Sequence, residues 1–284
     1  MRQVGAILRG LQCPPPIQLI ATIKYLTPRT NTYLVITSCL NGALFSGGTT
    51  DITVYKKLSN GRLQELCRAS GEDCGGTSVD NAFYQIFVKL VGAPLLNAMK
   101  KENPSAYLDI FREFEAVKRT VYTDKDAKVN MSIPLSILDK ICQKHLNEDF
   151  EAVIQSSLYH DKLILRHEKM RIDTNLIIDM FKQASERIIK LISDVLKKMK
   201  GSNLEMIVLV GGFSGCKVIQ DNIKSFFPSY RVIVPEDTEL AVLKGAVLFG
   251  HRLDYIAPEL PDILMMLASW LISIQTSMNH VGVL

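Results

Sequence analysis

Three glycine turns, at the ends of predicted strands, are the parts of this sequence best suited to chemistry. They lie at residues 46–51 (SGGTTD), 75–76 (GG) and 211–215 (GGFSG). Turns without Cβ atoms let backbone N–H groups approach phosphate oxygens closely, and a threonine hydroxyl with Asp51 nearby could hold Mg²⁺ or a water molecule. One such turn alone is more often an ordinary tight turn. Three of them in one α/β frame favour a nucleotide site.

A group of charges formed by Glu115, Lys118 and Arg119 falls within one turn of a helix predicted over residues 105–122. Its commonest explanation is a solvated set of i,i+3 and i,i+4 salt bridges. The functional alternative is a polar clamp for a ribose and a base. Glu239, at the start of the last predicted helix, could simply favour the helix dipole there. The five histidines and six cysteines show no spacing typical of a metal site, a disulfide framework or a nucleophile with its base.

The elements that must position these residues alternate between strands and helices. Strands are predicted over 33–36, 51–58 and 63–69 as an antiparallel meander, and helices over 78–91, 105–122 and 174–200. Strands at 206–210 and 231–234 then alternate with helices at 216–227 and 239–249, which indicates a parallel, covered sheet. We expect all five strands to lie in one sheet. In the middle of the sequence, residues 123–172, the pattern predicts only a strand near 129–133 and shorter helices.

The composition excludes several classes of protein. Of 284 residues, 47% are apolar and 22% charged, so the chain can bury a core. Its 33 basic and 29 acidic residues, with no run of five like charges, argue against a nucleic-acid binder. The longest apolar stretch, residues 263–274, is too short to cross a bilayer, and the start lacks a signal-peptide core. We therefore expect no transmembrane segment and a cytoplasmic protein in a reducing compartment.

Four segments together resemble the nucleotide-binding domain of the 70-kilodalton heat-shock chaperones. They read, in order, SGGTTDITVY, EAVKRT, IVLVGGFSGCKVIQDNI and IVPEDTELAVLKGAVLFG. The amino acids of these four segments are most similar to those of the atypical heat shock 70 kDa protein 12 branch of that family. The resemblance covers residues 33–250 and implies an α/β, actin-like ATPase (ribonuclease H-like) fold, mainly the second lobe of a chaperone nucleotide-binding domain. It further implies a remnant of the first lobe at 1–31, a second lobe at 32–250 with an upper subdomain inserted at about 71–172, and a divergent tail at 251–284.

The resemblance also implies roles for particular residues. Asp51 would be the catalytic and metal-associated residue, because it matches the aspartate that helps to position Mg²⁺ and water. The residues that would bind ATP or ADP belong to the second phosphate loop, the helix that holds adenine and ribose, the adenosine turn and the start of the last helix. They are Gly47, Gly48, Thr49, Glu115, Lys118, Arg119, Gly211, Gly212 and Glu239. Gly75 and Gly76 match a structural glycine pair at the entry to the upper subdomain.

Departures from the family pattern set limits on activity. Leu44 and Ser46 stand where the phosphate loop has an aspartate and its first glycine, and Gly215 replaces an arginine that stacks on adenine. A first phosphate loop is also missing from the sequence. The leading hypothesis is therefore an N-terminally truncated domain that binds ATP or ADP with Mg²⁺ but has little or no ATPase activity. Two alternatives stay open: a non-enzymatic module that binds other proteins, and a sugar or acetate kinase of the same superfamily.

Overall fold

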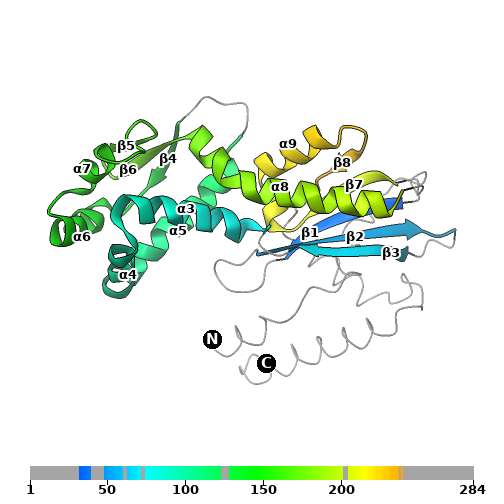
Figure 1. The fold of residues 1–284 in the computed structure, drawn as a ribbon, viewed down its shortest axis with the longest axis horizontal. Helices are drawn as coiled ribbons and strands as arrows, with labels where there is room; N and C mark the ends of the chain where they lie inside the picture. Colours follow the sequence, from blue (N-terminus) through cyan, green and yellow to red (C-terminus); the bar gives the residue numbers. More distant parts are fainter. Residues whose placement is uncertain are drawn as a thin grey trace, which may run out of the picture. The chain divides into compact units, whose positions relative to one another are not determined.

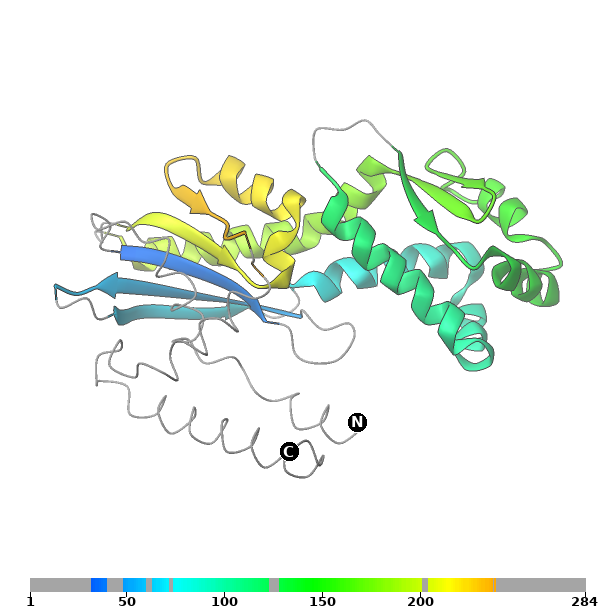
Figure 2. The same cartoon turned by 180° about the vertical axis from the view of Figure 1, so that it is seen from behind.

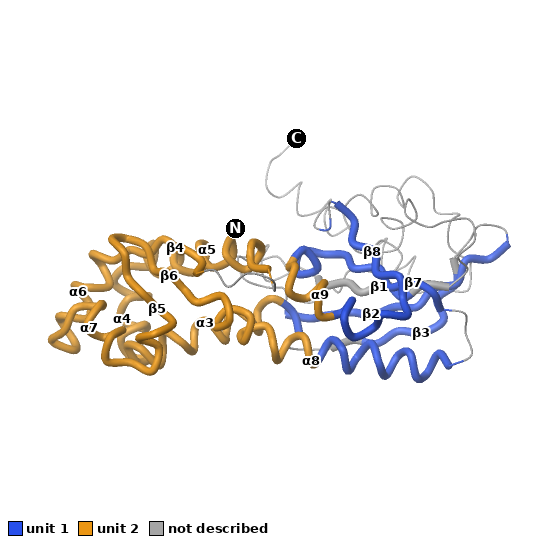
Figure 3. Tube along the Cα trace, turned by 90° about the horizontal axis from the view of Figure 1, so that it is seen from above, with its two compact units in different colours: residues 1–75, 187–215, 223–284 blue, residues 76–186, 216–222 orange. Residues whose placement is uncertain are grey.

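The computed structural model describes residues 32–39, 48–59, 63–71, 74–122, 128–200, 204–236 and 238, and its ribbon is drawn from two sides (Figure 1, Figure 2). The chain divides into two compact units (Figure 3). Unit 1 comprises residues 1–75, 187–215 and 223–284, and unit 2 comprises residues 76–186 and 216–222. The predicted segments at 1–31, 239–249 and 251–284 lie outside the described residues.

Unit 1 is built on a five-stranded sheet with the strand order β3-β2-β1-β7-β8. Its strands are β1 (Thr32–Cys39), β2 (Thr49–Lys57), β3 (Leu63–Gly71), β7 (Leu204–Val210) and β8 (Arg231–Ile233). β2 pairs antiparallel with β1 and β3, whereas β1 and β8 pair parallel with β7 (Figure 1). The prediction that all five strands share one sheet is confirmed.

The central strands of this sheet are covered on both faces. From Met206 to Val210, every residue of β7 is at most 1% exposed. This is the expected state of the continuous apolar run LEMIVLV, because a parallel strand with layers on both sides has no solvated face. β2 is likewise buried from Thr50 to Tyr55, although three of its residues there are polar.

The long helix α8 (Thr174–Lys198) contributes residues to both units. Its second half, in unit 1, runs along one face of the five-stranded sheet (Figure 1). The side chains of Ile188, Ile192 and Val195 are buried there. Leu191 fits the 3.6-residue helical period as well as Ile192 does, but it is only half-buried, so periodicity alone does not show which of the two faces the sheet.

Unit 2 consists of helices and a small antiparallel sheet with the order β4-β6-β5. Its elements are α3 (Gly76–Val91), α4 (Ala93–Glu102), α5 (Pro104–Thr120), β4 (Lys128–Ser132), α6 (Leu135–Leu146), α7 (Phe150–Gln155), β5 (Leu163–Arg166), β6 (Lys169–Asp173) and parts of α8 and α9 (Lys217–Phe226). The sequence predicted β4 and shorter helices but missed α4 and the β5–β6 hairpin. The hairpin strands are short, and the turn has His167 at φ +56° instead of the Asn-Gly pair that signals hairpins.

The core of unit 2 is aromatic. Phe83 of α3 stacks on Phe114 of α5 with ring centroids 3.8 Å apart, and it meets Phe87 edge-on at 5.1 Å. All three rings are at most 1% exposed. Helical spacing places Val79, Phe83, Ile86, Phe87 and Leu90 on one side of the helix predicted over 78–91, and all five are buried in α3. These ring contacts fix which sides of α3 and α5 face each other.

A sharp corner at Gly92 separates α3 from α4. Gly92 has φ +82°, a conformation that favours glycine, and Pro94 lies in the first turn of the next helix. Among the described residues no single helix is long and apolar enough to cross a membrane. In the same described part of the chain, only α3 and α4 taken together have the length and apolar composition of a membrane span, and the chain bends by 104° between them.

Candidate functional site

One edge of the unit 1 sheet collects the glycine turns that the sequence singles out. β1, β3 and β7 end at this edge and β2 begins there, because β2 runs antiparallel to its neighbours and β1 runs parallel to β7. The strand register aligns Val210, Thr37, Asp51 and Ser70 in one row across four strands. Asp51 thus lies one row in from the turn that follows β7. We call residues 48–51, 74–75 and 211–215 the glycine edge.

Two of the three predicted glycine turns are joined directly. The N–H of Gly75 donates to the carbonyl of Gly48 over 3.3 Å. Beside it, Thr50 Oγ1 donates to the carbonyl of Cys74 over 3.2 Å. Thr50 is 1% exposed and Asp51 is 2% exposed, so these polar side chains lie inside the protein. Backbone and hydroxyl groups therefore hold the start of β2 against the segment that leaves β3.

The third turn follows β7 and is held by hydrogen bonds to Thr238 and to the end of β7. Gly211 has φ +92° and donates its N–H to the carbonyl of Thr238 over 2.9 Å. The short helix η2 (Gly212–Gly215) comes next, and Ser214 Oγ donates to the carbonyl of Val210 over 2.7 Å. Only a glycine takes the conformation at Gly211 without strain. The turn presents buried glycine backbone rather than side chains at this end of β7.

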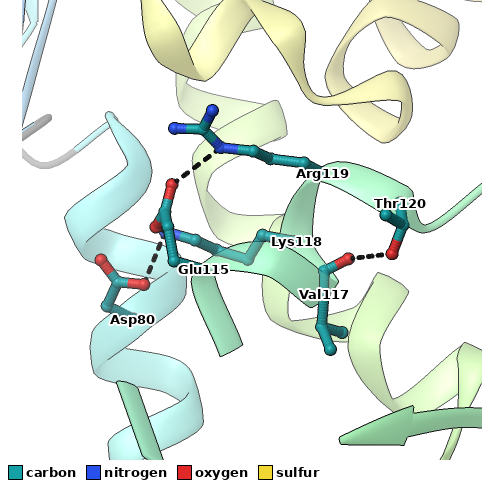
Figure 4. Close-up of polar contacts among 6 residues, drawn as sticks. All are labelled: Asp80, Glu115, Val117, Lys118, Arg119 and Thr120. Atoms are coloured by element: carbon teal, nitrogen blue, oxygen red, sulfur yellow. Dashed lines mark hydrogen bonds and ion pairs between the residues drawn. The ribbon is translucent and has the colours of Figure 1, made fainter. Parts of the chain in front are cut away.

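Unit 2 holds a cluster of four charged side chains, which we call the charged cluster: Asp80, Glu115, Lys118 and Arg119 (Figure 4). Lys118 Nζ lies 2.6 Å from Asp80 Oδ1 and 2.5 Å from Glu115 Oε2. Arg119 Nε lies 3.2 Å from Glu115 Oε1. Lys118 is only 3% exposed. The solvated salt-bridge set that would be the commonest explanation is therefore wrong for Lys118, which is also not available on an open helix face.

Asp80 is the member that sequence reasoning missed. It lies on α3, 38 residues before Lys118, and meets it only because the aromatic core packs α3 against α5. The stripe of α5 contains Ile110, Phe114 and Val117, so Lys118 sits next to the buried side of the helix. No local spacing connects α3 with α5. Asp80 could have been predicted only by packing the apolar side of the helix at 78–91 against the apolar side of the helix at 105–122.

The charged cluster shifts the proton affinities of its members. Burial alone would lower the pKa of Lys118, but Asp80 and Glu115 hold that pKa above its ordinary value. Burial raises the pKa of Asp80, and Lys118 offsets this only in part. Burial would also raise the pKa of Glu115, yet the hydrogen bonds and charges of Lys118 and Arg119 hold it below its ordinary value. Lys118 is therefore firmly protonated at neutral pH and is shared by two carboxyl groups.

Buried thiols lie near both regions but are poor nucleophiles. Burial raises the pKa of Cys216, whose charge environment includes the charged cluster, to about 12. Burial raises the pKa of Cys142 to about 11, and it also raises that of Cys74 on the glycine edge. Because the thiolate is the reactive form, none of these three side chains can act as a nucleophile at neutral pH.

The structure thus brings the predicted site residues together in two groups. Within unit 1, Gly48, Thr49, Asp51, Gly211 and Gly212 lie at one sheet edge. Within unit 2, the cluster holds Glu115, Lys118 and Arg119. The described residues do not include Leu44, Ser46, Gly47 or Glu239.

The donor set of the glycine edge fits a phosphate-bearing ligand better than a free metal ion. The described residues contain no group of three or more His, Cys, Asp or Glu side chains that could hold a metal. Mg²⁺ that arrives with a nucleotide needs only one or two protein carboxylates, because phosphates and water fill its other positions. Asp51 is a carboxylate of this kind on the glycine edge. The residues present therefore fit nucleotide-borne Mg²⁺.

Comparison with known proteins identifies the family. Residues 44–255 match the family described as Hsp70 protein, and because this is most of the chain, the chain belongs to the Hsp70 family. It is 31% identical to heat shock 70 kDa proteins 12A and 12B of Homo sapiens over 72% of its length, but spans only 30% of theirs. It is 26% identical to chaperone protein DnaK of Mycoplasmoides gallisepticum over 74% of its length and 32% of that protein's. The family resemblance is confirmed, and the mixed α/β architecture is consistent with an actin-like ATPase fold.

Proposed function

We propose that this chain binds an adenine nucleotide, ATP or ADP with Mg²⁺, with little or no hydrolysis, and that it corresponds mainly to the second lobe of a chaperone-type nucleotide-binding domain. The observation that carries the proposal is the glycine edge. There the strand register and the Gly75–Gly48 hydrogen bond gather separate glycine turns around one buried carboxylate, Asp51. Membership of the Hsp70 family supports the same ligand class. A cytoplasmic location is part of the proposal.

The proposed roles follow the family motifs. Backbone N–H groups of Gly47, Gly48 and Thr49 would bind phosphate oxygens, and the two glycines, which have no Cβ atom, let the anion approach closely. Asp51 would hold Mg²⁺ or its water. When bound, the metal would neutralise phosphate charge. The proposed contacts of adenosine are Glu115, Lys118, Arg119, Gly211, Gly212 and Glu239.

Two observations support weak binding. Lys118 already donates to two carboxylates and is only 3% exposed, so a ribose hydroxyl would be left with its third N–H, on a buried ammonium group. Gly215 has no side chain with which to stack on a base. Catalysis would be impaired further by Leu44 at the position of a carboxylate, because phosphoryl transfer depends on positioning and on stabilising charge.

The test is calorimetric titration of ADP with Mg²⁺ into the wild type, Lys118→Ala and Lys89→Ala. Lys89 is an exposed lysine of the same unit and serves as the matched control. A charge-assisted hydrogen bond contributes about 1.5–3 kcal/mol, so Lys118→Ala should weaken binding roughly tenfold or more and the control should not. Circular dichroism must show that both variants stay folded.

Three results would count against the proposal. Undetectable ADP binding by the wild type would favour the protein-interaction alternative instead. ATP turnover that is well above a no-protein control and is abolished by Asp51→Asn would show that the chain is an active ATPase. Transfer of phosphate to a sugar or to acetate would favour the kinase alternative.

A further inference from the structure

The small sheet of unit 2 has one apolar face and one basic face. On the apolar face, Leu163, Met131, Met170 and Ile172 are each 1% exposed. Side chains alternate along a strand, so the residues between them point to the opposite face. That face carries four basic side chains, and we call it the basic face: Lys128 of β4, Arg166 of β5, and Lys169 and Arg171 of β6. The three strands are visible side by side in Figure 2.

The register concentrates these cations. Arg166 lies directly opposite Lys169, and Arg171 lies between Asn130 and Ile164 in the adjacent row. Directly opposed side chains have Cβ atoms about 4.5–5.5 Å apart, and like charges in that position destabilise a sheet. The opposed Arg166 and Lys169 side chains therefore do not stabilise the fold. A ligand that carries negative charge would relieve the repulsion.

No internal partner neutralises the basic face within the part of the chain that the structure describes. None of its four cationic side chains has an ion pair or a side-chain hydrogen bond there, and Arg171 Nε is a buried donor without an acceptor. Asp173, on the same face opposite Lys128, accepts a hydrogen bond from the backbone N–H of Asn175. An unpaired guanidinium N–H that is shielded from water is costly unless an acceptor reaches it.

We propose that the basic face binds an acidic segment of a partner protein. Two inter-strand steps and two same-face steps along a strand give a surface of about 10 by 14 Å, which suits a few carboxylates on an extended or helical segment. The argument is charge complementarity between the basic face and an acidic segment. The face has four cationic side chains, one of which has an N–H without an acceptor, and only one carboxylate.

A polypeptide fits better than a nucleic acid. Binding to single strands typically uses aromatic side chains on which the bases stack, and the outward positions of these strands contain none. The chain as a whole is nearly balanced, with 33 basic and 29 acidic residues, and so lacks the broad positive field of a nucleic-acid binder. The proposal is independent of nucleotide binding, because the basic face shares no residue with the glycine edge or the charged cluster.

The experiment measures the fluorescence anisotropy of a fluorescein-labelled peptide of ten glutamates, titrated with the full chain. Arg166→Glu/Lys169→Glu reverses the opposed pair at the hairpin end of the basic face and keeps a like-charge pair opposed, so folding should be unaffected. The matched control is Lys89→Glu/Lys182→Glu, which makes the same change in net charge at exposed positions of the same unit. We expect at least about a tenfold loss of peptide affinity in the first variant and less than about a twofold loss in the control.

Three outcomes would overturn the proposal. The wild type could fail to bind the peptide, or both double variants could lose affinity equally, which would make net charge the cause. A labelled oligonucleotide of ten thymidines could bind the basic face more tightly than the peptide does, which would make the partner class wrong. Arg166→Lys, which keeps the charge, should retain most of the affinity, and thermal unfolding of each variant verifies that it is folded.

Discussion

The glycine edge of unit 1 and the charged cluster of unit 2 are built on opposite principles. The glycine edge is held by uncharged backbone and hydroxyl groups, with hydrogen bonds such as Gly75 N–H to the Gly48 carbonyl. The charged cluster depends on compensation of buried charge around Lys118. Backbone conformation determines which substitutions the glycine edge tolerates, and electrostatic balance determines which ones the charged cluster tolerates. Different substitutions should therefore break each of them.

The largest effect is expected when Lys118 loses its charge. In Lys118→Met a side chain of similar length fills the buried position, but Asp80 loses the partner that offsets its burial. Removing one member of a buried pair typically costs about 3–5 kcal/mol, and because the Asp80 side chain is 18% exposed we expect the lower end, about 3 kcal/mol. Urea unfolding of the variant and the wild type gives the difference in free energy of unfolding.

The matching control removes both charges. Lys118→Met/Asp80→Leu leaves no uncompensated carboxylate in the pair and should recover most of the lost stability, because apolar replacement of a buried pair is often nearly neutral. If the double variant is as unstable as Lys118→Met, packing around Lys118 rather than charge would explain the loss.

An intermediate effect is expected from adding a Cβ atom to the glycine edge. Gly211→Ala forces a side chain onto φ +92°, which should cost about 1–2 kcal/mol. Gly215→Ala is the control in the same turn. Its Cβ would lie 3.4 Å from Thr238 Oγ1, close to an ordinary contact, so that variant should lose clearly less. The measurement is thermal unfolding, with the midpoint of each variant converted to free energy.

Equal losses in the two glycine variants would contradict a conformational limit at Gly211. A normal ADP affinity in a folded Gly211→Ala would further show that the adenosine turn tolerates a side chain. Either result would mean that backbone conformation does not distinguish the glycine edge from the charged cluster in the way the structure indicates.

The two regions also differ in how much of them the sequence could predict. The five strands of unit 1 carry strong local signals, such as the apolar run of β7, so their common sheet could be predicted. The gathering of Gly48, Asp51 and Gly211 then follows from strand direction. The burial of Lys118 and its pairing with Asp80 depend on how α3 packs on α5, which no local spacing encodes. The binding and catalytic roles of all the predicted site residues stay predictions, and Gly47 and Glu239 also lie outside the described residues.

The smallest effect is expected from Glu115, the more exposed of the two carboxylates in the charged cluster. A carboxyl group whose folded-state pKa lies below its ordinary value of 4.5 adds stability above that pH and loses it as the pH falls. The side chain of Glu115 is 47% exposed, so solvent screens its ion pairs and Glu115→Gln should cost only about 0.5 kcal/mol at pH 7.

The difference between Glu115→Gln and the wild type should shrink as the pH falls below 4.5 and disappear once the pH passes the lower folded-state pKa, because the wild-type carboxyl group is then protonated and resembles the amide. Asp80 would give the opposite trend, since its folded-state pKa is raised and its protonation favours the folded state as the pH falls. Asp80 is present in both proteins, so its own trend appears in each unfolding curve and cancels in the difference between them. Urea unfolding of both proteins between pH 7 and pH 3 gives that difference, and a gap that stays constant or widens towards low pH would contradict the lowered folded-state pKa of Glu115.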